Sequence, residues 1–274
     1  MSRPAPHAEP EPTGATFAGE PAVALPGGGV IPLLGLGAWL LRDGREAEHA
    51  AAWALEAGYR HLDTAAAYGN EASVGRAVRA SGLPRSEIFV TTKMRPRDGD
   101  PERALADSLR RLGMDHVDLY LIHWPAPGSE RLWPGFERLR AAGLATAIGV
   151  SNWEPRQLEE LVERADVPPA VNQIDFNPFV FSSATLEAHR RLGVLLEAYS
   201  PLGHGRALGD PTVGEIARRL GRTPAQVLVR WALERGLPAI PKSAKRERIV
   251  ENRAVFDFTL GADDMALLDA LSRS

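Results

Sequence analysis

The feature that most constrains the fold is a regular alternation of short apolar runs with segments of helical periodicity. The strand-like runs span residues 34–37, 60–63, 88–93, 117–123, 146–150, 170–174, 195–199 and 237–241. The helical segments lie between them, at residues 46–56, 71–80, 101–112, 134–142, 155–165, 183–192, 213–220 and 224–234. Strand–helix alternation predicts parallel strands with right-handed crossovers. Eight such units within 274 residues favour a single (β/α)8 TIM barrel of the α/β class.

Short segments lie on either side of this alternation. Residues 22–25 and 30–32 are apolar and flank a Pro-Gly-Gly-Gly turn. This pattern predicts a β-hairpin, which could plug the bottom of the barrel. Helical patterns at residues 245–252 and 262–271 follow the last strand. We therefore expect an N-terminal β-hairpin and two additional C-terminal helices.

Residues 1–20 are rich in proline and poor in apolar side chains. We expect them to form a disordered N-terminal tail before one barrel domain at residues 21–274. An open, doubly wound sheet is the structural alternative. Against it, the string GLGAWL at residues 35–40 is the closest match to the dinucleotide pattern Gly-x-Gly-x-x-Gly, and it has leucine in place of the third glycine.

The composition excludes several classes of protein. With 44% hydrophobic and 24% charged residues, the chain is typical of globular proteins. A net charge of -3 gives no reason to expect a nucleic acid or an anionic membrane as partner, and no run of 18 apolar residues could cross a bilayer. The chain has no cysteine, which suits a reducing compartment, so we expect a cytoplasmic protein.

Polar residues stand at or just after the ends of three predicted strands. Asp63, Lys93 and His123 follow apolar runs at intervals of 30 residues, and Tyr68 comes five residues after Asp63. Polar groups at the carboxyl ends of successive barrel strands converge on one face, where such barrels keep their chemistry. Lys93 is one of only three lysines among 32 basic residues, which singles it out further. We predict that these four side chains form one site.

The chemistry of the four residues agrees with this prediction. A lysine ammonium beside a tyrosine is expected to lower the phenol pKa from about 10 toward neutrality. Asp63 could hold that lysine, and His123 could orient a carbonyl group, as a general acid to a developing alkoxide requires. Each residue alone has an ordinary alternative: Asp63 as a helix cap, Tyr68 as a core aromatic, His123 as a buried, satisfied histidine.

These four residues, with GLGAW at 35–39 and HWP at 123–125, resemble the aldo-keto reductase family over roughly residues 22–274. Further matching motifs are GVSN at 149–152, VNQ at 171–173, YSPLG at 199–203 and IPKS at 240–243. The loop after His123 is short, as in the microbial branch that includes 2,5-diketogluconate reductases. This branch would have a fairly open pocket for small carbonyl compounds.

The resemblance implies an oxidoreductase that reduces aldehydes or ketones with NADPH. Tyr68 would donate the proton, Lys93 would tune it, Asp63 would hold Lys93, and His123 would hydrogen-bond the carbonyl. The implied cofactor contacts are Gly37, Asp63, Ser151, Asn152, Gln173, Tyr199, Ser200, Leu202, Lys242, Ser243, Arg248, Glu251 and Asn252. The implied substrate pocket comprises Trp39, Tyr68, His123 and Trp124.

The residue types in segment 242–252 also support a cofactor-binding role on physical grounds. Lys242, Ser243 and Arg248 lie at or just after the eighth strand, where barrels often bind phosphate. In a helix, Arg248, Glu251 and Asn252 share one face. Two cations and a hydroxyl suit the 2′-phosphate of NADP; a solvated basic helix is the alternative.

Two rival functions belong to other classes. His61 and Asp63 could be a ligand pair in a metal-dependent barrel hydrolase, although further ligands are not evident. A non-catalytic, cofactor-binding regulatory subunit is the other rival, and the presence of all four catalytic residues argues against it. We expect no metal, a small carbonyl substrate as the only partner, and a monomer.

Overall fold

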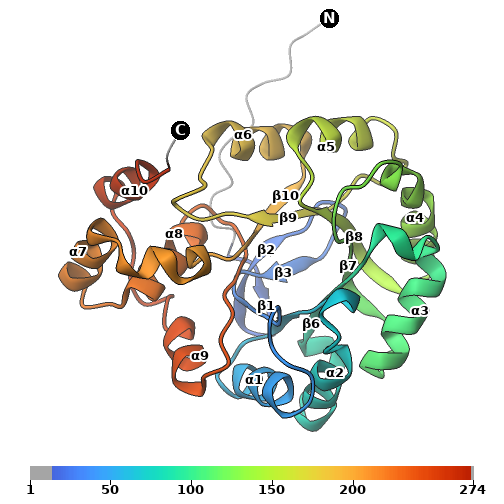
Figure 1. Ribbon diagram of the computed structural model, residues 1–274, viewed down its shortest axis with the longest axis horizontal. Helices are drawn as coiled ribbons and strands as arrows, with labels where there is room; N and C mark the ends of the chain where they lie inside the picture. Colours follow the sequence, from blue (N-terminus) through green and yellow to red (C-terminus); the bar gives the residue numbers. More distant parts are fainter. Residues whose placement is uncertain (1–13, 273–274) are drawn as a thin grey trace, which may run out of the picture.

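The computed structural model describes residues 14–272, and at its centre is one sheet of eight strands surrounded by helices (Figure 1). The strands are β4 (Gly35–Gly37), β5 (His61–Asp63), β6 (Phe89–Met94), β7 (Val117–Ile122), β8 (Ala145–Ser151), β9 (Val171–Asp175), β10 (Leu195–Tyr199) and β11 (Ala239–Ile240). Each pairs in parallel with the next in chain order. Leu34 bridges Ala239, whose N–H donates to Leu33 O at 2.9 Å. The last strand therefore meets the first, and the predicted (β/α)8 barrel is confirmed.

The barrel strands read as apolar runs because both of their faces are covered. In β6 every residue is buried, including Lys93. The helices around the sheet are α1 (Arg45–Glu56), α2 (Glu71–Ala80), α3 (Pro101–Leu112), α4 (Trp133–Ala141), α5 (Pro155–Val162), α6 (Ser183–Leu192), α7 (Pro211–Leu220), α8 (Pro224–Leu233), α9 (Arg246–Arg253) and α10 (Ala262–Asp269). Among the residues described, no helix is long and apolar enough to cross a membrane.

Helix α3 shows how local sequence sets the helix boundaries. The Asp100 side chain accepts a hydrogen bond from the N–H of Arg103 at 3.1 Å, and Pro101 occupies the first helical position. Both features favour a helix start. Gly113 ends the helix with φ of 66°, a left-handed conformation that glycine adopts without strain.

Both predicted C-terminal helices are present, as α9 and α10, and their contacts show how each is placed. Helix α9 contacts α8 on one side and α1 on the other, so it is the eighth helix of the ring and closes it. Only α10 of the predicted pair lies outside the ring. The other helix outside the ring is α7, which precedes α8 and contacts both α8 and α10 (Figure 1).

The N-terminal hairpin has one strand more than predicted. It comprises β1 (Thr16–Phe17), β2 (Glu20–Ala24) and β3 (Val30–Pro32) in an antiparallel sheet. Regular structure thus begins within the range assigned to the tail, because Thr16 and Phe17 pair with residues 20–21; residues 1–13 lie outside the described part of the chain.

The hairpin closes one end of the barrel with apolar side chains. Ile31 is fully buried in a cluster with Leu119 and Leu121 of β7. The ring of Phe17 meets that of Phe89 edge to face, with 6.0 Å between centroids. This end of the barrel is therefore packed, and the polar residues lie toward the opposite, carboxyl ends of the strands.

Candidate active site

The carboxyl ends of β5, β6 and β7 bring three of the predicted side chains to one place. Asp63 is the last residue of β5, Lys93 lies near the end of β6, and His123 directly follows β7. The parallel register aligns Asp63 with Thr91 and Lys93 with Leu121. Residues 30 positions apart in sequence thus become neighbours because adjacent parallel strands end together.

Asp63 and Lys93 form a buried ion pair. Lys93 Nζ lies 2.6 Å from Asp63 Oδ1 and 2.7 Å from Oδ2, and it donates to the Thr64 carbonyl oxygen at 3.0 Å. The Lys93 side chain is 0% exposed. Burial is the largest single influence and would lower the pKa of Lys93, but the charges of Asp63, Tyr68 and Glu197 and the hydrogen bond to Asp63 together raise that pKa above its ordinary value. The ammonium is therefore charged at neutral pH.

Tyr68 extends over this pair from the short 3-10 helix η1 (Ala66–Tyr68). Its hydroxyl lies 3.4 Å from Lys93 Nζ, and its ring contacts that of His123 with 5.4 Å between centroids. Burial raises the pKa of Tyr68, while the Lys93 charge acts in the opposite direction. The predicted shift toward neutrality is therefore wrong for this structure, because burial outweighs the ammonium. The phenol is protonated at neutral pH.

Asn70 holds the loop that carries Tyr68, and sequence reasoning missed it. Its Nδ2 donates to the carbonyl oxygens of Ala38 and Leu41, both at 2.9 Å, and its Oδ1 accepts from the Thr64 hydroxyl at 2.8 Å. Asn70 is fully buried. It thus ties the loop after β4 to the loop after β5.

His123 is an uncharged imidazole in this site. It is 5% exposed, and burial, followed by the charges of Lys93 and Arg95, lowers its pKa to about 3. Its Nδ1 is buried and has no hydrogen-bond partner within residues 14–272. The ring stacks against Trp124, with 5.5 Å between centroids.

The side chains expected at a nicotinamide form a connected group beside the four residues. Tyr199 donates to Asn152 Oδ1 at 2.8 Å, and Asn152 Nδ2 donates to Ser151 Oγ at 2.9 Å and to the His123 carbonyl oxygen at 3.2 Å. Ser151 Oγ donates to the Gln173 carbonyl oxygen at 2.8 Å. Tyr199 is only half-buried, so part of its ring is accessible.

Gln173 joins this group to the ion pair. Its Nε2 donates to Asp63 Oδ2 at 2.8 Å and to Glu197 Oε2 at 2.9 Å. Sequence reasoning did not single out Glu197. The available signal was an acidic residue in the middle of the apolar strand Leu195–Tyr199, where an unpaired charge would be costly.

The predicted cofactor segment lies where β11 meets β4. The N–H of Gly37 donates to the Pro241 carbonyl oxygen at 3.1 Å, so Lys242 follows directly beside the end of β4. Lys242 is exposed and Ser243 is buried. Ser243 Oγ accepts from the N–H of Lys245 at 3.0 Å.

Helix α9 presents the remaining predicted contacts. Arg248 is exposed and has no ion-pair or hydrogen-bond partner among the described side chains. Glu251 accepts from the Thr223 hydroxyl at 2.8 Å. Asn252 is buried, and its Oδ1 has no partner within residues 14–272. The three do not share one environment: Arg248 faces solvent, while Glu251 and Asn252 are at least partly enclosed.

The residues around the rim are exposed aromatic and loop residues. Trp39 is 44% and Trp124 is 50% exposed. Ser200 directly follows β10 with φ of 48°, and Leu202 is half-buried on the same loop. The Trp39 ring meets that of His204 edge to face, with 5.8 Å between centroids.

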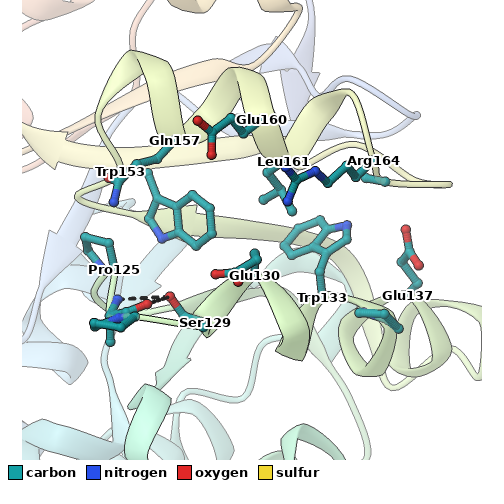
Figure 2. A pocket seen from close by; sticks show the side chains of 15 residues that line it. Pro125, Ser129, Glu130, Trp133, Glu137, Trp153, Gln157, Glu160, Leu161 and Arg164 are labelled. Carbon is teal, nitrogen blue, oxygen red and sulfur yellow. Dashed lines mark hydrogen bonds between the residues drawn. The ribbon is translucent and has the colours of Figure 1, made fainter.

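A cavity of about 510 Å³ lies elsewhere, between the loop after β7, α4 and α5. Figure 2 shows the indole rings of Trp133 and Trp153 lining it. None of the four residues of the predicted site contributes to its wall. The shifted pKa values of Tyr68, Lys93 and His123 belong to groups that lie together at the barrel mouth, and such a cluster favours the mouth as the candidate site.

No set of three or more His, Asp or Glu side chains within residues 14–272 is arranged to hold a metal ion. His61 contacts Thr91 and faces Glu197, whereas Asp63 contacts Lys93 and Gln173. The two members of the pair suggested for a metal hydrolase therefore face different partners.

Comparison with known proteins identifies the family. Residues 33–273 match the aldo/keto reductase family. An aldo-keto reductase of Mycolicibacterium vanbaalenii is 48% identical over 258 residues, covering 92% of both chains. The crystal structure of an aldo/keto reductase from Brucella melitensis is similar with a TM-score of 0.88 at 43% identity, covering 92% of this chain and 98% of that chain. This chain belongs to the aldo-keto reductase family.

A more distant member of the aldo-keto reductase family has been crystallised in complex with NADP. It is from Bombyx mori and is similar to this chain with a TM-score of 0.86 at 34% identity, covering 92% of this chain and 93% of its own. As an aldo-keto reductase, the present chain is an NADP-dependent oxidoreductase that reduces aldehydes or ketones to alcohols. The relatives named here favour neither a hydrolase nor a regulatory subunit.

Proposed function

We propose that Tyr68 is the general acid of this reductase and that Asp63, Lys93 and His123 support it. NADPH, when bound, supplies a hydride from C4 of its nicotinamide to the carbonyl carbon. Negative charge then develops on the carbonyl oxygen, and the Tyr68 hydroxyl gives its proton to that oxygen. The product is an alcohol, and the phenolate regains a proton from solvent.

The observation that carries this proposal is the position of the Lys93 ammonium between the Asp63 carboxylate and the Tyr68 hydroxyl. It lies 2.6 Å from Asp63 Oδ1 and 3.4 Å from the Tyr68 hydroxyl. Its positive charge stabilises the phenolate that proton transfer leaves behind. Asp63 fixes the position of the ammonium. His123, being neutral, can donate one hydrogen bond to the carbonyl oxygen without adding charge.

The residues present fit a nicotinamide at one end of the site. We propose that its ring stacks on Tyr199 and that its carboxamide binds Ser151, Asn152 and Gln173. The N–H groups of Asn152 and Gln173 already donate to protein acceptors. Their side-chain oxygens suit the NH2 of a carboxamide, because Asn152 Oδ1 has a second lone pair beside the one that accepts from Tyr199.

The other end fits a phosphorylated adenosine. We propose that Lys242, Ser243 and Arg248 bind the 2′-phosphate, since an exposed guanidinium with no partner among the described residues suits a phosphate. Asn252 has a buried oxygen without a donor, which suits an adenine amino group, and Glu251 lies next to it. The remaining proposed contacts are Gly37, Ser200 and Leu202.

We propose small carbonyl compounds as substrates, as in the 2,5-diketogluconate reductase-like branch. Trp39 and Trp124 are the proposed walls, and their half-exposed rings leave the mouth open. The connection from β7 to α4 is short and includes only η4 (Ser129–Leu132). A panel of aldehydes, ketones and keto sugars, assayed by loss of NADPH absorbance, tests this; activity only on bulky apolar ketones would contradict it.

The role of Tyr68 is tested with Tyr68→Phe. We expect kcat/KM for reduction to fall by roughly 10²–10⁴-fold, the usual contribution of a general acid, while NADPH fluorescence titration gives an unchanged Kd. Tyr120→Phe is the matched control, because its buried hydroxyl has no partner among the described residues. Retention of most activity in Tyr68→Phe would mean that another group serves as the acid.

The chain is also proposed to act as a cytoplasmic monomer. The lack of cysteine suits a reducing compartment. Size-exclusion chromatography with light scattering tests the monomer; a stable dimer at enzyme concentrations used in assays would contradict it.

A further inference from the structure

A second carboxyl group lies buried beside the catalytic ion pair, and the proposed mechanism gives it no role. This group is Glu197 of β10, whose side chain is 0% exposed. Gln173 Nε2 donates to Glu197 Oε2 at 2.9 Å and to Asp63 Oδ2 at 2.8 Å. A single amide group thus bridges two carboxyl groups in the barrel interior.

The other oxygen of Glu197 faces a buried histidine. Oε1 lies 3.7 Å from Nδ1 of His61, and within residues 14–272 neither atom has a hydrogen-bond partner. The opposite ring nitrogen, Nε2, pairs with Thr91 Oγ1 at 3.0 Å. Gly35 makes room for the ring, because a Cβ at that position would lie 2.6 Å from Nδ1. The separation of 3.7 Å is longer than a hydrogen bond, so an ionised Oε1 would be buried without a donor among the described residues.

The charges around Glu197 decide whether it holds a proton. His61 and Asp63 face it from β5 and Lys93 from β6, while β9 contributes only the neutral Gln173. If Asp63 and Glu197, which Gln173 bridges, were both ionised, two negative charges would share the single ammonium of Lys93. Like charges this close disfavour ionisation of one of the two carboxyl groups. Lys93 contacts both oxygens of Asp63, so Asp63 is the ionised member.

The titration behaviour of the pair agrees with this geometry. Burial, followed by the charge of Asp63, raises the pKa of Glu197 to about 8. Burial, followed by the charge of Lys93, lowers the pKa of His61 to about 3. Both groups are thus neutral at pH 7, with the proton on the carboxyl group and none added to the imidazole.

We propose that Glu197 is a positioning residue of this reductase: buried beside Asp63, it stays protonated and so keeps the Asp63–Lys93 pair electrically balanced next to Tyr68. The inference rests on the proposed role of Tyr68 as the acid. Ionisation of Glu197 adds a second negative charge, which raises the pKa of Tyr68 and makes it a weaker proton donor. Glu197 touches neither substrate nor cofactor in this account and acts through the charge balance.

Infrared spectroscopy tests the proton directly. Glu197→Gln preserves the size of the side chain and can still accept from Gln173, but it cannot ionise. The difference spectrum of wild type minus Glu197→Gln at pH 7 should contain the C=O band of a protonated carboxyl group. Glu160→Gln is the control, because this glutamate is exposed on α5 and its replacement should show no such band. A spectrum without the band overturns the proposal.

If the variant folds poorly, the same test can be made on the wild-type protein alone. Its carboxyl band should disappear as the pH is raised past about 8, near the pKa of Glu197. Neither spectrum depends on catalysis. A failure of the proposal for Glu197 can therefore be distinguished from a failure of the proposed role of Tyr68. Tyr68→Phe with full activity would remove the catalytic role of Tyr68 and leave the infrared band unchanged.

The pH profile of reduction tests the catalytic consequence. At about pH 6.5, kcat/KM of Glu197→Gln should equal that of wild type. Above pH 8 the wild type and Glu160→Gln should decline more steeply than Glu197→Gln, by up to about ten-fold for each pKa unit by which ionised Glu197 weakens Tyr68 as an acid. Alkaline limbs that coincide in wild type and Glu197→Gln overturn the proposal.

Discussion

Replacement of Lys93 by methionine tests how the site is held together. The side chain is 0% exposed, so the ammonium interacts with protein groups and not with solvent. Its loss removes two donor contacts to Asp63 and one to the Thr64 carbonyl oxygen. Asp63 would then keep one side-chain donor, Gln173 Nε2 at 2.8 Å. An uncompensated charge would remain buried.

The expected cost follows from that unpaired carboxylate. Removal of one partner from a buried ion pair typically destabilises a protein by about 3–5 kcal/mol. This is a large share of the roughly 5–15 kcal/mol that separates folded from unfolded domains. Urea unfolding at pH 7.5 measures it. Lys242→Met is the matched control, since the same substitution at an exposed lysine should change the unfolding free energy by no more than about 0.5 kcal/mol.

A double variant separates the charge from the shape of the side chain. Adding Asp63→Asn to Lys93→Met removes the orphaned charge and should restore most of the lost stability. Both variants should lose reductase activity, because Tyr68 loses its stabilising cation. If Lys93→Met unfolds at the same urea concentration as Lys242→Met, the ion pair does not hold the site and the reasoning fails.

Three further predictions concern the cofactor, the Tyr68 loop and pH. Arg248→Met should weaken NADPH binding by roughly ten- to hundred-fold, the worth of a charged hydrogen bond, and leave the NADH Kd unchanged; equal losses for both cofactors would refute contact with the 2′-phosphate. Asn70→Ala removes three buried hydrogen bonds and should cost roughly 2–3 kcal/mol in urea unfolding; a change below about 0.5 kcal/mol, the usual size of a surface effect, would contradict its role as a tie. Between pH 6.5 and 8 the folded state keeps the Glu197 proton that the unfolded state has lost, because its pKa is raised to about 8. Stability of the wild type should therefore fall by roughly 2 kcal/mol as the pH rises through this window, and a Glu197→Gln variant that shows the same fall would exclude Glu197 as its source.

The sequence was sufficient to predict the barrel and the convergence of Asp63, Tyr68, Lys93 and His123 at one place. Strand and helix periods are local properties, and equal spacing of Asp63, Lys93 and His123 placed them at the ends of adjacent strands. Helix boundaries such as that of α3 were predictable because Asp100, Pro101 and Gly113 act through the local backbone alone. The sequence signals for these parts are local, although the structure that they predict is held together by distant contacts.

Other features depend on contacts that no local pattern contains. The bridge from Asp63 through Gln173 to Glu197 joins residues 110 and 24 positions apart, and it requires the register of β5, β9 and β10. The pKa of Tyr68 was predicted in the wrong direction because burial, which depends on the whole site, outweighs the nearby charge. The position of α9 in the ring likewise depended on its contacts with α1 and α8.

The most direct test of the account is a crystal structure of the wild-type protein with bound NADP⁺. The account predicts the nicotinamide ring on Tyr199, its carboxamide at Asn152 and Gln173, and C4 directed toward the space between Tyr68 and His123. A nicotinamide bound away from Tyr68, for example in the cavity between α4 and α5, would contradict it.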